Sequence, residues 1–180
     1  MKIKKLLISL LLLISCMFAL AGCGNQYNAT LTYTRYDGLK GYINEGFLEE
    51  NKIYGACYET YSEENGTEYV RLKDETFPRT RTFIIKSKKE FDNIFIEKPQ
   101  ELNIDFENQI LIIHTDTTLY NRPIKLQTVK ADDNILTIKM KMNDGKHGVG
   151  SASMPCQIYL FVVMDKVDIT TANCELLNAG

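Results

Sequence analysis

The chain has 180 residues and a formal net charge of −2 at pH 7. A chain with an acidic balance lacks the positive electrostatic footprint that nucleic acids require, so the composition argues against a nucleic-acid partner. The length is that of one domain. Folding at this size buries roughly 70% of the surface that the unfolded chain exposes, which is enough for an independent core.

The first 23 residues have the pattern of an export signal. Three lysines within residues 1–5 precede an apolar run over residues 6–20, and Leu20-Ala21-Gly22-Cys23 closes the run with small residues before a cysteine. This order predicts a secretory signal peptide over residues 1–22. Without those residues the chain has 18 basic and 23 acidic side chains and a formal charge of −5.

The segment Leu20–Cys23 resembles the lipobox of bacterial lipoproteins, and the flanking basic and apolar regions fit that family as well. The resemblance implies a diacylglyceryl group on the thiol of Cys23, palmitate-type acyl chains and removal of residues 1–22. Two or three acyl chains hold a domain durably at a membrane, because each buried methylene contributes about 0.8 kcal/mol. The alternative is an uncleaved transmembrane anchor, but the apolar run is shorter than the roughly 20 residues that a spanning helix needs.

The polar residues 23–29 fit a short tether between the lipid and a folded domain over residues 30–180. We therefore expect an extracytoplasmic location, with the membrane as one partner through Cys23. In a cell with two membranes, the sequence leaves open which of them holds the protein.

Three cysteines remain in the domain, namely Cys57, Cys156 and Cys174. An odd number allows at most one internal disulfide, and free cysteines are usually buried as small hydrophobic residues. We expect buried thiols, with a Cys156–Cys174 bridge as the alternative. There is no CxxC spacing and there are only two histidines, so the sequence predicts neither a metal site nor a cofactor.

The first half of the domain contains four predicted strands and one helix. A β-rich segment covers residues 30–36, and Asn65-Gly66 predicts a type I′ turn between strands over residues 54–62 and 67–73. A strand over residues 82–86 leads into Ser87-Lys88-Lys89-Glu90, a capping box that predicts a helix over residues 88–96. Residues 40–52 show no clear period.

The second half has β patterns. The apolar run 110–113 is typical of a core strand, residues 124–128 and 136–142 alternate, and residues 131–134 have turn chemistry. The strand at 156–164 is apolar on both faces, which predicts a central position. The tail after residue 165 shows no assignable pattern. The sequence thus predicts a mainly β (α+β) domain, an antiparallel β-sandwich or partly open barrel of about seven strands with one short helix.

Two places carry candidate functional side chains. His114 and Asp116 follow the apolar run at the expected end of a strand, and the glycine-dense loop 144–153 contains Asp144, His147 and Ser151. Long loops at the rim of a β domain often present binding residues, so we treat these five as binding-loop candidates. A surface hydrolase using His114 or His147 is the alternative, although Ser151 lacks a GxSxG elbow.

Residues 83–165 are similar to the small domain of PrcB-type protease-complex subunits. The features that carry the similarity are the Ser87–Phe91 helix start, Ile104-Asp105-Phe106 before the core strand, and Pro155 before the last strand. The chain has Leu119–Pro123 where those domains have a Thr-Gly-Gly-Tyr-like stretch. The resemblance implies a non-catalytic interaction module with protein partners, and it assigns no functional residue. The sequence thus predicts a membrane-anchored lipoprotein that binds a protein or another ligand without catalysis.

Overall fold

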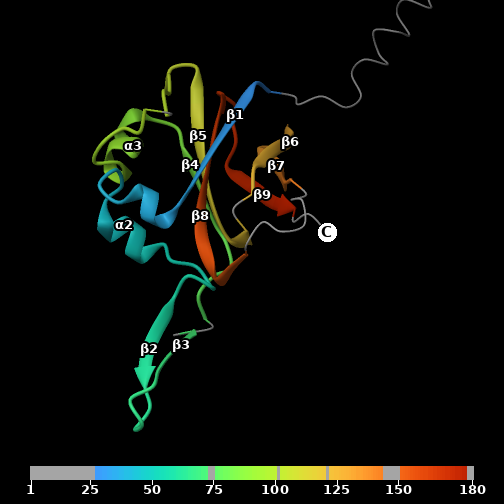
Figure 1. Ribbon diagram of the computed structural model, residues 1–180. Helices are drawn as coiled ribbons and strands as arrows, with labels where there is room; N and C mark the ends of the chain where they lie inside the picture. Colours follow the sequence, from blue (N-terminus) through green and yellow to red (C-terminus); the bar gives the residue numbers. More distant parts are fainter. Residues whose placement is uncertain (1–26, 73–75, 101, 121, 144–150, 178–180) are drawn as a thin grey trace, which may run out of the picture.

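The computed structural model describes residues 27–72, 76–100, 102–120, 122–143 and 151–177. Within these ranges it contains nine strands, two α-helices and one 3-10 helix (Figure 1). In chain order these elements are β1 (Ala29–Arg35), η1 (Tyr36–Leu39), α2 (Glu45–Glu50), β2 (Tyr58–Ser62), β3 (Glu68–Leu72), β4 (Arg81–Ile85), α3 (Lys88–Ile94), β5 (Gln109–Tyr120), β6 (Ile124–Asp132), β7 (Ile135–Met142), β8 (Ser151–Asp165) and β9 (Thr171–Leu177).

The main sheet has four antiparallel strands in the order β1-β8-β5-β4. Its two central strands are those with continuous apolar runs, because a strand that is covered on both faces needs apolar residues in both phases. Residues 110–113 of β5 and 158–164 of β8 are all buried. The predicted central positions of both runs are confirmed.

The second sheet has three strands in the order β6-β7-β9. The β6–β7 hairpin closes through Asp133 and Asn134, both at positive φ (44° and 65°), as a two-residue type I′ turn requires. The unassigned tail forms β9, which pairs in parallel with β7. The expected antiparallel pairing therefore does not hold between β7 and β9, and the described residues form nine strands rather than about seven.

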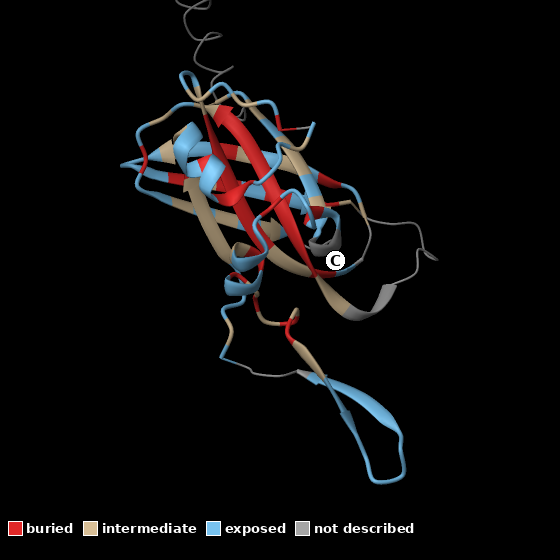
Figure 2. Cartoon of the chain, turned by 90° about the vertical axis from the view of Figure 1, so that its left-hand side faces the viewer, coloured by how far each residue is buried: buried red, intermediate tan, exposed pale blue. Residues whose placement is uncertain are grey.

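Two hydrophobic clusters cover the two faces of the main sheet, and they define three layers. One cluster fills the space between the sheets, where the alternating side chains of β7 pack against residues of β5 and β8. The other lies under η1, α2 and α3. Figure 2 shows the buried central strands between exposed outer segments. The mainly β, sandwich-like fold is confirmed, with a helical layer on its outer face.

The predicted helix is present as α3, with the capping box formed by Ser87 and Glu90. It ends at Ile94 rather than at residue 96, because Phe95 takes an extended conformation and bridges to Ile43. The second helix, α2, is a correction to the single predicted helix. Its six residues bury one side chain, Leu48, so the sequence contains no period to reveal it.

The predicted hairpin of β2 and β3 is present, but its turn is not type I′. Among the described residues with positive φ it contributes Gly66 alone, at 82°. The amide of Gly66 donates to the carbonyl of Glu63 (2.9 Å), and the side chain of Asn65 accepts from the amide of Thr67 (2.7 Å). Asn65 therefore acts through its side chain, and only the glycine takes the left-handed conformation.

Candidate functional site

The predicted site residues lie partly outside the described ranges. Cys23, Asp144 and His147 lie outside the described residues. Ser151 is described by its backbone alone, which begins β8 and pairs with Tyr120 of β5. None of the described helices is long and apolar enough to cross a membrane.

His114 lies in the middle of β5, not at the end of a strand as the sequence suggested. The strand continues to Tyr120, and the imidazole is 1% exposed on the face that packs against the second sheet. Its Nδ1 lies 2.8 Å from Oγ1 of Thr82, and no carboxylate of the described chain bonds to either ring nitrogen. Burial lowers the pKa of His114 to about 4, because the charged imidazolium loses its hydration. These are the surroundings of a neutral core histidine rather than of a catalytic base.

The neighbours of His114 are similarly enclosed. Asp116, two residues along the same strand, is half-buried, and this burial raises the pKa of its carboxyl group. Burial raises the pKa of the Cys174 thiol to about 12, although a hydrogen bond with Thr82 opposes the shift. The thiol is therefore protonated at neutral pH and is a poor nucleophile.

The structure places none of the three cysteines of the domain in a disulfide, so the alternative of a Cys156–Cys174 bridge is not realised. Cys57 is buried and the other two are half-buried. Across the described ranges, no group of three or more His, Cys, Asp and Glu side chains is arranged to hold a metal ion. The described His, Cys, Asp and Glu side chains therefore form no assembled metal centre.

The β2–β3 hairpin is exposed and extends away from the sandwich (Figures 1 and 2). Its strands pair only with each other, in a two-stranded sheet of their own. On one face, the rings of Tyr61 and Tyr69 stack at 5.5 Å between centroids, and the Arg71 guanidinium lies 4.8 Å from the Tyr61 ring. Arg71 also forms a salt bridge of 2.7 Å with Glu59. The hairpin therefore has an ordered aromatic and charged surface.

The hairpin keeps large hydrophobic side chains in contact with solvent. Tyr61 is 37% exposed, Tyr69 is 40% exposed, and Val70 on the opposite face is 50% exposed. A two-stranded hairpin without a core is marginally stable in water, and the stacked tyrosines supply only a small stabilisation. Exposed apolar side chains gathered on one projecting element are typical of an interaction surface.

The base of the hairpin is fixed to the main sheet by a buried polar side chain. Gln157 of β8 donates to the carbonyl of Asn51 (3.1 Å) and to the hydroxyl of Tyr159 (3.1 Å), and its Oε1 accepts from the amide of Ile53 (3.4 Å). Beside it, Gly55 at φ 86° packs against Thr117 of β5, at a spacing that leaves little room for a larger residue. These contacts join the segment that leads into the hairpin to the main sheet.

A second set of contacts closes the base from the other side. The amide of Tyr54 donates to the carbonyl of Pro78 (2.7 Å), which brings the two ends of the hairpin segment together. The guanidinium of Arg79 lies 4.7 Å from the Tyr54 ring. The sequence signalled the hairpin through its Asn-Gly turn, but it carried no signal for the role of Gln157, which lies inside an apolar run.

The hairpin and the start of the domain are at opposite ends of the main sheet. Ala29 pairs with Met164, whereas Gln157 at the hairpin base lies seven residues earlier on β8. At about 3.4 Å per residue this separation is roughly 24 Å before the length of the hairpin is added. Figure 1 shows β1 starting at the end of the sandwich away from β2 and β3.

Comparison with protein families, with curated proteins and with solved structures found no match. The similarities of Leu20–Cys23 to a lipobox and of residues 83–165 to PrcB-type subunits therefore stay predictions.

Proposed function

We propose that the protein is a lipid-anchored, extracytoplasmic lipoprotein that binds a protein partner without catalysis and contacts it through the β2–β3 hairpin. The observation that supports the proposal is the exposed aromatic surface of Tyr61 and Tyr69, with Val70 exposed on the opposite face, on an element that projects from the domain. Tyrosine and arginine are enriched at the energetic centres of protein interfaces, and the hairpin places Arg71 against the tyrosine stack.

The polarity of the domain fits an anchor at Cys23. Ala29 is six residue steps from Cys23, so an extended tether spans at most about 21 Å. A lipid on Cys23 would keep the start of β1 close to the membrane surface. The hairpin, at the other end of the main sheet, would then extend away from the membrane toward a partner.

A site-specific photocrosslinker tests the hairpin contact. It replaces Tyr61 or Tyr69 in the full chain, produced in its own cells, and a matched control carries it at Lys130, an exposed position on β6. We expect one discrete adduct with another protein from both hairpin positions and none from Lys130. The absence of an adduct from the hairpin, or equal adducts from all three positions, contradicts the proposal.

Once the crosslinked partner is purified, its affinity for the double variant Tyr61→Ala, Tyr69→Ala measures the contribution of the aromatic surface. Each truncation at the centre of an interface costs about 1–2 kcal/mol, so we expect affinity to fall by about thirtyfold or more. Ile135→Ala removes a comparably exposed apolar side chain (42%) from the domain body and serves as the control. An equal loss from Ile135→Ala would show that the hairpin is not the contact.

The lipid anchor is tested separately. Cells are labelled with a clickable fatty acid, and the mass of the mature protein and its distribution between membrane and soluble fractions are measured. We expect Cys23→Ala to remove the label and release the protein, and Cys57→Ala to leave the label in place. Labelling that persists in Cys23→Ala contradicts the anchor while leaving the hairpin result unaffected.

A further inference from the structure

Strand β1 has an unpaired edge. It is the first strand of the order β1-β8-β5-β4, so β8 lies on one side and no strand of the described chain pairs with the other. The ladder with β8 fixes which residues face outward. The amide of Asp165 donates to the carbonyl of Asn28 (3.1 Å), which makes these two a hydrogen-bonded pair. Because such pairs alternate, the even-numbered residues bond to β8, and Leu31 and Tyr33 direct their amides and carbonyls outward.

This edge has none of the features that usually protect an exposed strand. Natural edge strands commonly carry inward charges, prolines or bulges that prevent pairing with another chain. Residues 29–34 read Ala-Thr-Leu-Thr-Tyr-Thr, and their register with β8 is continuous. The first charged residue is Arg35, at the end of the strand. The edge therefore presents main-chain donors and acceptors that a further strand would satisfy.

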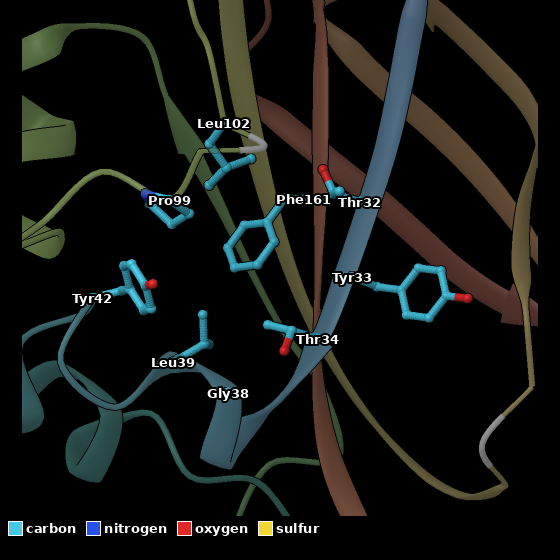
Figure 3. A pocket seen from close by; sticks show the side chains of 9 residues that line it. All are labelled: Thr32, Tyr33, Thr34, Gly38, Leu39, Tyr42, Pro99, Leu102 and Phe161. Atoms are coloured by element: carbon cyan, nitrogen blue, oxygen red, sulfur yellow. The ribbon is translucent and has the colours of Figure 1, made fainter.

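A pocket of about 330 Å³ lies against this edge (Figure 3). Figure 3 shows the Tyr33 side chain directed away from the other labelled side chains, so the pocket meets Tyr33 at its main chain. The Tyr33 hydroxyl instead accepts from the amide of Ile124 (3.3 Å) on the second sheet. The main chain of Tyr33 therefore lines the pocket, while its side chain bonds to the second sheet.

The lining of the pocket selects for an uncharged group. Phe161, which is 3% exposed, forms its floor, with Leu39 and Leu102 beside it and the hydroxyls of Thr34 and Tyr42 at its walls. None of the nine lining residues is an acid or a base of the kind charged at neutral pH. A carboxylate, phosphate or ammonium group entering the pocket would lose hydration without a partner charge, whereas an aliphatic side chain would gain from burial.

We infer that the β1 edge and this pocket bind an extended segment of a partner polypeptide by strand addition, with one uncharged apolar side chain in the pocket. Main-chain hydrogen bonds to Leu31 and Tyr33 supply affinity in this mode, and the pocket supplies selectivity. In an antiparallel added strand, the residue opposite Thr34 points to the pocket face and the preceding residue lies opposite Arg35. An acidic residue opposite Arg35 would pair with its positive charge, and an aliphatic residue opposite Thr34 would enter the pocket. The bound segment therefore carries an acid followed by an aliphatic residue.

This site is independent of the proposed hairpin contact. The pocket lies on the helical face beside β1, and its lining includes no residue of β2 or β3. Loss of either site by substitution leaves the other intact, so the two can be tested apart.

The probe is a capped, fluorescent seven-residue peptide of alternating threonine and valine with a central Glu-Leu pair, titrated into the full chain in a non-ionic detergent. Two isomers carry a single N-methyl group, one on the residue opposite Tyr33 and one on the leucine. Only the first loses an amide that faces β1. We expect the first isomer to bind at least tenfold more weakly than the parent and the second to bind within threefold. Equal affinities of the two isomers, or no binding of the parent at 1 mM, overturn the inference.

Variants of the chain test the pocket itself. Thr34→Glu places a charge at the pocket wall, and Thr30→Glu places the same charge on an exposed position of the same strand and face, outside the pocket. We expect Thr34→Glu to lower the affinity for the parent peptide at least tenfold and Thr30→Glu to change that affinity less than threefold. A neutral oligosaccharide such as chitobiose is titrated in parallel. Binding of the sugar without the peptide overturns the inference and assigns the pocket to a glycan.

Discussion

Burial of the His114 imidazole couples the stability of the domain to pH. The side chain is 1% exposed, and its pKa falls to about 4 in the folded chain, against about 6.5 when it is solvated. Between these two values the unfolded state binds a proton that the folded state does not. The contribution of His114 to the free energy of unfolding is therefore fully present above pH 6.5 and decreases as the pH falls toward 4.

The size of the effect follows from the two pKa values. Integrating the proton uptake from pH 8 to pH 5 gives a loss of roughly 2 kcal/mol from this residue. Asp116 acts in the opposite direction, because burial raises its pKa and its protonation stabilises the folded state at low pH. The contribution of the histidine must therefore be measured as a difference between variants.

His114→Gln supplies that difference, because glutamine keeps a hydrogen-bonding group near Thr82 and does not titrate. The measurement is urea unfolding followed by circular dichroism at pH 8, 6.5 and 5, on the chain from Gly24 onward, which keeps every described residue. We expect the wild type to lose about 2 kcal/mol more than His114→Gln between pH 8 and pH 5. Parallel stability profiles of the two proteins would refute the assignment of His114 as a buried neutral histidine.

Four further substitutions test three local features of the fold by the same unfolding measurement. Ser87→Ala removes the cap of α3 and is expected to cost about 1 kcal/mol, and an unchanged midpoint would contradict the capping box. Gly55→Ala and Gly41→Ala both place an L-residue at φ 86°, which costs about 1–2 kcal/mol of stability. We expect the larger loss from Gly55→Ala, because only its Cβ would also meet a neighbour, Cγ2 of Thr117 at 3.3 Å. Equal losses would show that this contact is unimportant. Met140→Ala opens a cavity between the sheets and is expected to cost about 2–5 kcal/mol, whereas its removal at no cost would place Met140 outside the core.

The sequence predicted those parts of the fold in which local chemistry and burial agree. The apolar runs predicted at 110–113 and 156–164 identified the two central strands, because only strands covered on both faces are apolar in both phases. The capping box identified the start of α3, because its two hydrogen bonds depend on residues three positions apart. The strand β9 was missed because it buries one face only in part, so its alternation is weak.

The candidate site was harder to predict because its features depend on contacts between distant segments. His114 follows an apolar run, a position that fits a strand end equally well, and only the pairing with Thr82 and Leu160 shows that the strand continues. The role of Gln157 could not be predicted for the same reason, since its partners Asn51 and Ile53 lie more than 100 residues away. A single sequence contains no signal for such pairings, whereas the hairpin turn at Gly66 is encoded within four residues.

The two proposed contact surfaces differ in how the fold prepares them. The hairpin is held at its base and by the stack of Tyr61 on Tyr69 but has no core, so fixing its position against a partner costs conformational entropy that the partner has to offset. The β1 edge is already fixed by its ladder to β8 and by the bond from Ile124 to the Tyr33 hydroxyl, so an added strand meets a rigid template. Preorganisation reduces the cost of binding, and the β1 edge is therefore suited to short segments with few contacts. The hairpin is suited to a larger partner whose surface buries both of its exposed tyrosines together.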